Sequence, residues 1–257
     1  MSDASQLSVA ASRISAVDRL ALCLDFDGTL APVNPDPAAV SLDSKIASLL
    51  AEIAEPADTF VAIISGRSIK DIRERVGIEV VRYAGNHGLE VGTGEDTWIH
   101  PDASEAKPEL STLLDTLASA LADQDCVRIE DKGVTATIHY RDCEPTVRAA
   151  IHETVLEVAD TAPRIRVTRG RAASQLRPAI SWDKGAAVRE LVTDWNPSLT
   201  VYIGDDYTDE AALSAVRDLP GEGLPIAVGR RPDTAAYRLD SVGEVHELLR
   251  SIRTARS

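Results

Sequence analysis

The stretch LALCLDFDGTL, residues 20–30, decides the fold that we expect for this chain of 257 residues. It begins with an apolar run that is typical of a strand inside a sheet, and Asp25 and Asp27 come at the end of that run. Because residues i and i+2 of extended backbone point to the same side, the two carboxylates are expected in one crevice. Two carboxylates this close need a cation between them or a shared proton. The alternative is a solvated pair at a strand-to-turn junction.

Short apolar runs recur along the chain, and segments with helical spacing lie between them. Strands that alternate with helices predict an α/β fold built on a doubly wound parallel (Rossmann-like) sheet. In such a sheet, functional residues gather at the carboxyl ends of the strands. The further runs are residues 60–65, 80–85, 200–205 and 225–229.

The middle of the chain has a different pattern. Two pairs of strand-like runs predict two hairpins, the first around residues 131–133 and the second around a Gly-Arg turn. Together with a helical stretch they predict a separate α+β domain, inserted at residues 101–177. The parallel core then comprises residues 1–100 and 178–257. The four runs are residues 126–130, 134–140, 164–170 and 172–178.

A second acidic cluster, GDDYTDE at residues 204–210, follows another apolar run. Hard carboxylate oxygens suit Mg²⁺, which takes one or two protein carboxylates together with waters and phosphate oxygens. Asp205 is the expected metal ligand of this cluster. Asp206 and Asp209 are expected to orient metal-bound waters. The alternative is that acidic residues here only cap the next helix.

Two further motifs carry groups that bind phosphate. Ser65, Gly66 and Arg67 close a strand and open a helix, where a hydroxyl and free N–H groups bind phosphate oxygens well. Lys184 opens a helix after the inserted domain. If a carboxylate such as Asp25 attacks phosphorus to form an aspartyl phosphate, a cation here would neutralise the charge of that carboxylate and of the phosphoryl group that is transferred. The alternatives are that Ser65 is only a helix N-cap and that Lys184 is a solvated surface residue.

Composition restricts the partners of the chain. Its net charge of −14 repels nucleic acid and anionic membranes, so neither is expected as a partner. No apolar run approaches the ~20 residues of a membrane helix, and no signal-peptide pattern is visible, which predicts a soluble cytoplasmic protein. The three cysteines form no C-x-x-C pair, so neither a zinc site nor a disulfide framework is expected.

Taken in order, DFDGTL, SGR, a later Lys-Gly pair and GDDYTDE resemble the haloacid dehalogenase-like superfamily of phosphotransferases over nearly the whole chain. The resemblance implies that Asp25 is the nucleophile and that Asp27 is the general acid and then the base. It implies that Ser65 and Lys184 contact the phosphoryl group. Mg²⁺ would lie on Asp25, Asp205 and the backbone carbonyl of Asp27. The inserted domain resembles that superfamily's large α/β cap.

A narrower resemblance is to trehalose-phosphate phosphatases. It rests on DFDGTLAP (25–32), YAGNHGLE (83–90), EDKG (130–133), HYR (139–141) and GDDYTDE (204–210). It implies that cap residues face the sugar phosphate, that residues 85–88 lie near the substrate entrance, and that trehalose 6-phosphate is the first candidate substrate. The residues expected to bind substrate on this basis are Thr29, Gly66, Arg67, Asn86, His87, Gly88, Glu130, Lys132, His139, Arg141 and Gln175.

Several of these residues have plain structural alternatives. His87 would hydrogen-bond within its own loop, His139 would be an ordinary sheet residue, and Lys132 would be a solvent-exposed turn residue. Gln175 departs from the family, which usually has Glu there. Because Gln loses the charge and adds donors, the identity of the sugar stays open. Sucrose phosphate, mannosyl-phosphoglycerate and glucosylglycerol phosphate are the alternative substrates.

Two other functions share this pattern of motifs. A phosphomutase uses the same aspartyl phosphate but returns the phosphoryl group to a sugar. An inactive regulatory homologue would keep the fold without turnover. A sugar-phosphate synthase is a candidate partner, and the sequence does not determine the oligomeric state.

Overall fold

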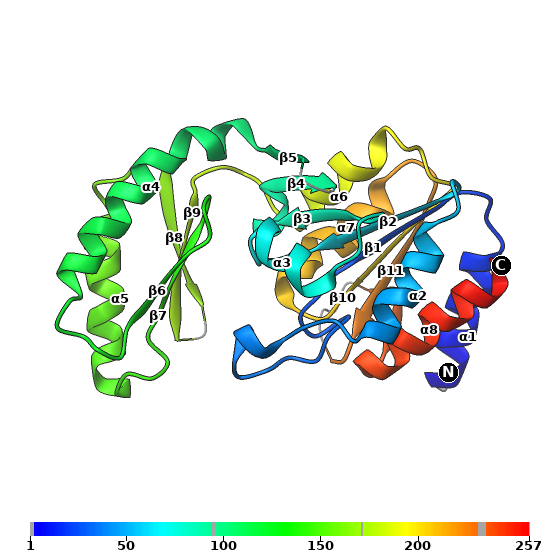
Figure 1. Cartoon of the computed structure of the whole chain (residues 1–257), viewed down its shortest axis with the longest axis horizontal. Helices are drawn as coiled ribbons and strands as arrows, with labels where there is room; N and C mark the ends of the chain where they lie inside the picture. Colours follow the sequence, from blue (N-terminus) through cyan, green and yellow to red (C-terminus); the bar gives the residue numbers. More distant parts are fainter. Residues whose placement is uncertain (1–2, 94–95, 171, 231–234, 257) are drawn as a thin grey trace. The chain divides into compact units, whose positions relative to one another are not determined.

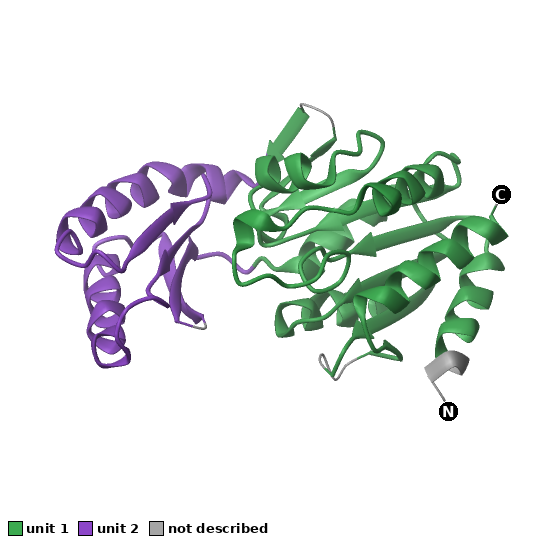
Figure 2. Cartoon of the chain, turned by 60° about the horizontal axis from the view of Figure 1, so that its bottom comes forward, with its two compact units in different colours: residues 1–98, 182–257 green, residues 99–181 purple. Residues whose placement is uncertain are grey.

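The computed structural model describes residues 3–93, 96–170, 172–230 and 235–256. The chain divides into two compact units (Figure 2): unit 1 comprises residues 1–98 and 182–257, and unit 2 comprises residues 99–181. The sequence pattern predicts these boundaries after residues 100 and 177, and the units divide after residues 98 and 181.

Unit 1 is built on a mostly parallel sheet, most of whose strands are labelled in Figure 1. Its described strands have the order β12-β11-β10-β1-β2-β3-β4-β5. Strands β12 to β3 are parallel, and only the β3–β4 pair is antiparallel among those for which the register is given. The order reverses between β1 and β10, and ligands bind at such a switch point in doubly wound sheets. The predicted fold class is confirmed. The strands are β1 (Leu20–Leu24), β2 (Thr59–Ile64), β3 (Arg82–Gly85), β4 (Glu90–Thr93), β5 (Asp96–Ile99), β10 (Leu199–Gly204), β11 (Glu222–Val228) and β12 (Tyr237–Leu239).

Helices cover both faces of this sheet because β1 is apolar on both sides. Leu20, Leu22 and Leu24 pack into a core with α1, α2, α3 and α8. Ala21 and Cys23 point the opposite way and pack against α6 and α7. Among the described residues, no helix is both long and apolar enough to cross a membrane. The helices are α1 (Asp3–Ser15), α2 (Ser44–Ala54), α3 (Ile69–Val76), α6 (Lys184–Thr193), α7 (Glu210–Asp218) and α8 (Val242–Ala255), with short 3₁₀ helices η1 (Pro37–Ala39), η2 (Asn86–Gly88) and η3 (Tyr207–Asp209).

Unit 2 has an antiparallel sheet of its own, with strand order β6-β7-β9-β8. The β6–β7 and β8–β9 pairs confirm the two predicted hairpins. Ala136, Ile138 and Leu176 pack into a separate core with the two helices of the unit. The elements are α4 (Pro101–Ala120), β6 (Arg128–Asp131), β7 (Ala136–His139), α5 (Pro145–Ala159), β8 (Ile165–Gly170) and β9 (Ala173–Pro178).

Unit 2 also contains a disulfide bond between Cys126 and Cys143, which encloses the β6–β7 hairpin. The expectation that the cysteines form no disulfide is wrong at this pair. Sequence spacing indicates only pairs of near neighbours, whereas the hairpin brings together two cysteines that are 17 residues apart. The third cysteine, Cys23, is free, and burial in β1 raises the pKa of its thiol to about 12.

Candidate active site

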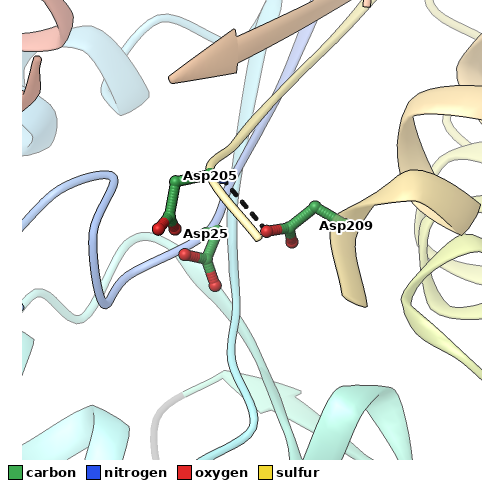
Figure 3. A group of neighbouring side chains, drawn as sticks. All are labelled: Asp25, Asp205 and Asp209. Carbon is green, nitrogen blue, oxygen red and sulfur yellow. Dashed lines mark hydrogen bonds between the residues drawn. The ribbon is translucent and has the colours of Figure 1, made fainter. Parts of the chain in front are cut away.

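The carboxylates of Asp25 and Asp205 meet where β1 and β10 end. Leu24 is in register with Ile203, so the residues that follow these two strands lie next to each other at the switch point. One carboxylate oxygen from each of Asp25, Asp205 and Asp209 lies within 4.8 Å of the other two. Figure 3 shows the three side chains turned toward one another. The predicted convergence of the two acidic motifs is therefore present in the structure.

Gly28 makes this approach possible. Its φ of +95° is a left-handed conformation that favours glycine, and a methyl group at this position would collide with the carboxylate of Asp205. The adjacent Thr29 is buried, and its hydroxyl donates to Oδ1 of Asp205 at 3.3 Å. Thr29 thus contacts a carboxylate of the candidate metal site, although the sequence predicts a substrate-binding role for it.

Lys184 lies between two of the acids. It is the first residue of α6, whose N-cap is Asp183, and its side chain is only 3% exposed. Nζ donates to Oδ1 of Asp25 at 2.6 Å and to Oδ1 of Asp209 at 2.7 Å. Burial opposes its charge, but the two carboxylates outweigh burial and raise the pKa of Lys184. The alternative, a solvated surface lysine, is wrong.

Asp209 is fully buried and saturated with donors. Besides Lys184, Oδ1 accepts the hydroxyl of Tyr202 at 2.6 Å, and Oδ2 accepts the backbone N–H groups of residues 205 and 206 at 3.1 and 3.0 Å. Asp206 caps η3 through the N–H of Tyr207. Because both oxygens of Asp209 are engaged, Asp25 and Asp205 are the better candidates for metal ligands, and Asp209 anchors the loop that carries Asp205.

Burial raises the pKa values of two of these acids, Asp25 and Asp205. Burial, opposed by the charge of Lys184, raises the pKa of Asp25, and the charge of Asp209 adds to the increase. Burial and the charge of Asp209 raise the pKa of Asp205 to about 6. Two neighbouring carboxyl groups with raised pKa values resist ionising together. A cation bound between them would favour the ionised form of both.

Ser65 and Arg67 occupy the turn between β2 and α3. Ser65 is buried, and its Oγ accepts the N–H of Arg67 at 3.2 Å. Helix α3 begins at Ile69 with Ser68 as its N-cap, so the alternative that Ser65 is the N-cap is wrong. The guanidinium of Arg67 binds the carboxylate of Asp27 with two hydrogen bonds of 2.7 Å each.

The loop at residues 85–88 packs against this turn. The N–H of Asn86 donates to the carbonyl of Arg67 at 2.6 Å, and that of His87 donates to the carbonyl of Ser65 at 2.8 Å. Gly66 leaves room for the His87 ring, because a Cβ at Gly66 would lie 2.8 Å from Cε1. Gly88, with φ +92°, packs against Ala187 of α6.

Glu90 and Tyr202 are two buried polar residues that no sequence motif singles out as functional. Oε2 of Glu90 accepts the N–H of Ile69 at 2.9 Å and the side-chain amide of Asn86 at 2.8 Å, so it joins the 85–88 loop to the start of α3. Tyr202 bonds Asp209 from inside β10. A tyrosine in an apolar strand signals such a partner, since a buried hydroxyl needs one.

In unit 2, several predicted substrate-binding residues share one face of the sheet. Glu130 is in register with Thr137, and Thr137 is in register with Gln175, so the three form a row across β6, β7 and β9. Nε2 of His139 lies 2.7 Å from Oε2 of Glu130, and Nζ of Lys132 lies 3.9 Å from the same oxygen. Lys132 is 19% exposed, which is less than a solvated turn residue would be. Arg141 follows β7 and is exposed.

The fold is that of a known class of hydrolases. A haloacid dehalogenase-like hydrolase from Bacteroides thetaiotaomicron superposes with a TM-score of 0.62 and 17% identity, over 91% of this chain and 99% of that one. The C-terminal domain of the trehalose-6-phosphate phosphatase from C. albicans superposes with a TM-score of 0.79 and 23% identity, over 96% of each chain. The structure therefore has the haloacid dehalogenase-like fold, with acidic residues at the switch point of its sheet.

Sequence comparison identifies the family within that class. Residues 23–242 match the family model described as trehalose-phosphatase. A trehalose-phosphate phosphatase from Mycobacterium avium is 36% identical over an alignment that covers 95% of this chain and 65% of that relative. The chain belongs to the trehalose-phosphatase family, a family of phosphoric monoester hydrolases, and the resemblance in its motifs is confirmed. It spans about two thirds of the length of this curated relative.

Proposed function

We propose that the protein is a Mg²⁺-dependent phosphatase that hydrolyses trehalose 6-phosphate to trehalose and phosphate through an aspartyl phosphate on Asp25. The observation that carries the proposal is the meeting of Asp25, Lys184 and Asp205 at the switch point of the sheet. A buried carboxylate beside a buried cation and a second acid suits nucleophilic attack on phosphorus. The names of the relatives favour trehalose 6-phosphate among sugar phosphates.

The donor set around Asp25 fits a hard divalent cation. The neighbouring oxygens are carboxylate oxygens, which Mg²⁺ prefers. Asp25 and Asp205 would hold the ion, with the backbone carbonyl of Asp27 as a third ligand, and Asp206 would orient its waters. The sequence predicts that Asp209 shares that role, but both of its oxygens already accept hydrogen bonds, so it would hold Lys184 and the loop that carries Asp205 instead. When bound, Mg²⁺ neutralises charge on the phosphoryl oxygens.

Asp25 and Asp27 divide the chemistry between them. A carboxylate oxygen of Asp25 forms a bond to phosphorus while the bond from phosphorus to the sugar oxygen breaks, and Asp27 gives its proton to that oxygen. Asp27 then takes a proton from a water whose oxygen attacks phosphorus, and the bond to Asp25 breaks. Lys184 and Ser65 hold the phosphoryl group, and Lys184 balances the charge of Asp25 in the resting site.

Unit 2 is proposed to act as a specificity cap. Its Glu130, Lys132, His139, Arg141 and Gln175 offer charged and amide groups that suit sugar hydroxyls and phosphate. Gln175 lies in the row with Glu130, which supports a role in recognising the same ligand.

The test is phosphate release from trehalose 6-phosphate with Mg²⁺ and with EDTA, for the wild type and for Asp25→Asn. We expect activity only with the metal, and a loss of roughly 10³-fold or more in the variant, since removal of a nucleophile costs at least this much. Substantial turnover by Asp25→Asn would reject Asp25 as the nucleophile. An isomerised sugar phosphate in place of free phosphate would indicate a mutase. Release from sucrose phosphate, mannosyl-phosphoglycerate or glucosylglycerol phosphate alone would reassign the sugar.

A further inference from the structure

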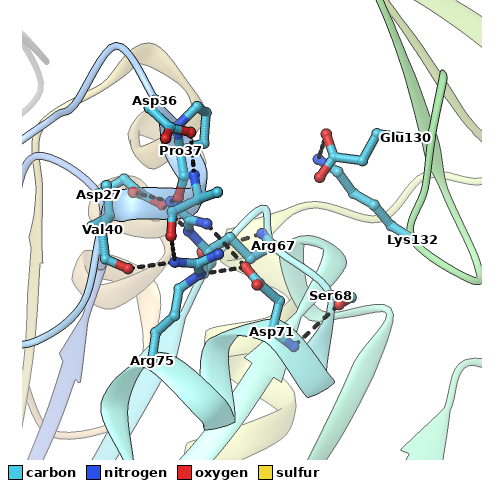
Figure 4. Close-up of polar contacts among 12 residues, drawn as sticks. Asp27, Asp36, Pro37, Val40, Arg67, Ser68, Asp71, Arg75, Glu130 and Lys132 are labelled. Atoms are coloured by element: carbon cyan, nitrogen blue, oxygen red, sulfur yellow. Dashed lines mark hydrogen bonds and ion pairs between the residues drawn. The ribbon is translucent and has the colours of Figure 1, made fainter. Parts of the chain in front are cut away.

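The carboxylate of Asp27 is held by a fork of two hydrogen bonds. Nε of Arg67 donates to Oδ2 and Nη2 donates to Oδ1, both at 2.7 Å (Figure 4). The side chain of Arg67 is 12% exposed and that of Asp27 is 35% exposed, so the guanidinium is shielded from water while the carboxylate stays partly accessible. Such bidentate pairs fix the plane of a carboxylate, which a single hydrogen bond does not do.

Arg67 is in turn held by groups of unit 1. Nη1 donates to Oδ2 of Asp71 at 2.9 Å, and Nη2 also donates to the carbonyl of Pro37 at 3.0 Å. Each guanidinium nitrogen therefore already has an acceptor from the protein. A phosphate or sugar oxygen would have to compete with two carboxylates for this side chain, which argues against Arg67 as a substrate ligand.

Arg75 extends the network by one helical turn. Oδ2 of Asp71 accepts Nε of Arg75 at 2.8 Å, and Nη1 of Arg75 donates to the carbonyl of Ala38 at 2.9 Å and to that of Val40. Burial opposes the ionised form of Asp71, but hydrogen bonds from Arg75 and Arg67 outweigh it and lower the pKa of Asp71. The segment around η1, which follows the nucleophile motif, is thereby tied to α3.

We propose that Arg67, Asp71 and Arg75 form a positioning network. This network orients the carboxylate of Asp27 toward the leaving oxygen of the sugar, which Asp27 must protonate. The inference rests on the function proposed above, because it requires Asp27 to transfer the proton. A carboxylate has about four lone-pair sites, so a bidentate pair leaves sites on both oxygens for that proton. The position of this carboxylate affects the rate strongly, since a misplacement of a reacting group by about 1 Å can cost roughly 10²-fold in rate.

Arg67→Lys tests the network because lysine keeps the charge but cannot form the fork. We expect kcat for trehalose 6-phosphate to fall roughly tenfold or more, with KM within about twofold of the wild type. With p-nitrophenyl phosphate, whose leaving group departs without a proton, the burst of p-nitrophenolate should keep its wild-type rate. A rise in KM at unchanged kcat would make Arg67 a substrate ligand, and an equal loss in the burst rate would indicate a general structural role. Either result overturns the proposal.

A double-mutant cycle tests whether Arg67 acts through Asp27. In the Asp27→Asn background, Arg67→Lys should reduce kcat by less than about twofold, since the group it positions is already gone. Losses that multiply, so that the double variant shows the product of both single effects, would show that the two residues act independently and would overturn the proposal.

Asp71→Asn tests the outer part of the network with a change of almost constant shape. It should lower kcat about threefold to tenfold with little change in KM, because the second carboxylate that orients Arg67 loses its charge. The matched control is Glu52→Gln, which breaks the exposed pair of Glu52 with Arg253 in the same unit. The control should retain wild-type kcat. Equal kcat in Asp71→Asn and the control would remove Asp71 and Arg75 from the network.

Asp25→Asn separates the failure of this inference from failure of the proposed function. If Asp25→Asn is inactive while Arg67→Lys has wild-type kcat, the phosphatase proposal stands and the positioning network is rejected. If Asp25→Asn remains active, the aspartyl-phosphate mechanism is rejected. The positioning network is then rejected as well, because it depends on proton transfer by Asp27 in that mechanism.

Discussion

Gly28 is the residue on which the geometry of the acidic site depends most directly. Its left-handed backbone turns the chain back so that the N–H of Gly28 reaches the carbonyl of Ala31 at 2.7 Å. The absence of a side chain then lets the carboxylate of Asp205 lie against it. One position thus serves both the turn after the nucleophile and the placement of the candidate metal ligand.

Gly28→Ala should therefore weaken metal binding as well as the fold. The methyl group must displace the Asp205 carboxylate, and we expect the Mg²⁺ concentration for half-maximal activity to rise roughly tenfold or more. Gly77→Ala is the matched control, because Gly77 also has a positive φ, of +69°, but nothing lies within 4 Å of its added Cβ. It should lose about 1 kcal/mol of stability without a change in Mg²⁺ dependence. A Mg²⁺ titration of both variants checks this, and identical curves would contradict it.

The sequence predicts the acidic residues of the site better than it predicts the residues that hold them in place through hydrogen bonds. Asp25, Asp205 and Lys184 follow apolar runs or open a helix, so local pattern and spacing point to them. The bonds from Tyr202 to Asp209 and from Asp71 to Arg67 depend on which elements become neighbours in the folded chain. No local pattern distinguishes Asp71 from an exposed helical acid, which is why the network around Asp27 could not be predicted.

The β6–β7 hairpin of unit 2 is an element that combines local stability with the proposed recognition of sugar. Its Glu130 and His139 face each other at 2.7 Å and are 38% and 28% exposed. The hydrogen bond from His139, opposed by burial, lowers the pKa of Glu130. Because the folded-state pKa is lowered, the stabilisation is fully present above the ordinary value of 4.5 and is lost as the pH falls through the folded-state pKa.

Glu130→Gln should accordingly destabilise unit 2 at neutral pH and have less effect in acid. The expected loss is at most about 1 kcal/mol, because the pair is partly exposed. Unfolding monitored between pH 3 and pH 7 should show the difference between wild type and variant shrinking below pH 4.5. Glu157→Gln, on the exposed face of α5, is the control and should match the wild type throughout. A difference that is constant with pH would contradict the role of this pair.

Elements with a strong local pattern were the predictable ones. The apolar run of β1 and the hairpin turn at residues 131–133 predict their structures because the pattern and the turn residues agree. Strands β4 and β5 have four residues each, and neither has the apolar run of the longer strands. In β5 the tryptophan, Trp98, is exposed. The Cys126–Cys143 bond joins positions that only the folded hairpin brings together.

The molecule as a whole has separate cores, since the apolar clusters of unit 1 and unit 2 share no residue. The candidate metal ligands all belong to unit 1, and the disulfide belongs to unit 2. The three tryptophans, Trp98, Trp182 and Trp195, are all in unit 1. Metal binding therefore acts on unit 1, and reduction of the disulfide acts on unit 2. Tryptophan fluorescence reports on unit 1 alone.

We predict that Mg²⁺ and a thiol reductant shift different unfolding transitions. At about 100 times its dissociation constant, Mg²⁺ should stabilise unit 1 by about 2.7 kcal/mol and raise the midpoint of the tryptophan fluorescence transition. Reduction of a disulfide that closes a loop of 17 residues should cost unit 2 about 3 kcal/mol, lowering a transition seen by circular dichroism but leaving the fluorescence midpoint in place. The variant Cys126→Ser/Cys143→Ser is the control and should not respond to the reductant. A fluorescence midpoint that moves with the reductant as far as the circular dichroism signal would mean that the two units unfold as one, and the separate cores would then have no independent stability.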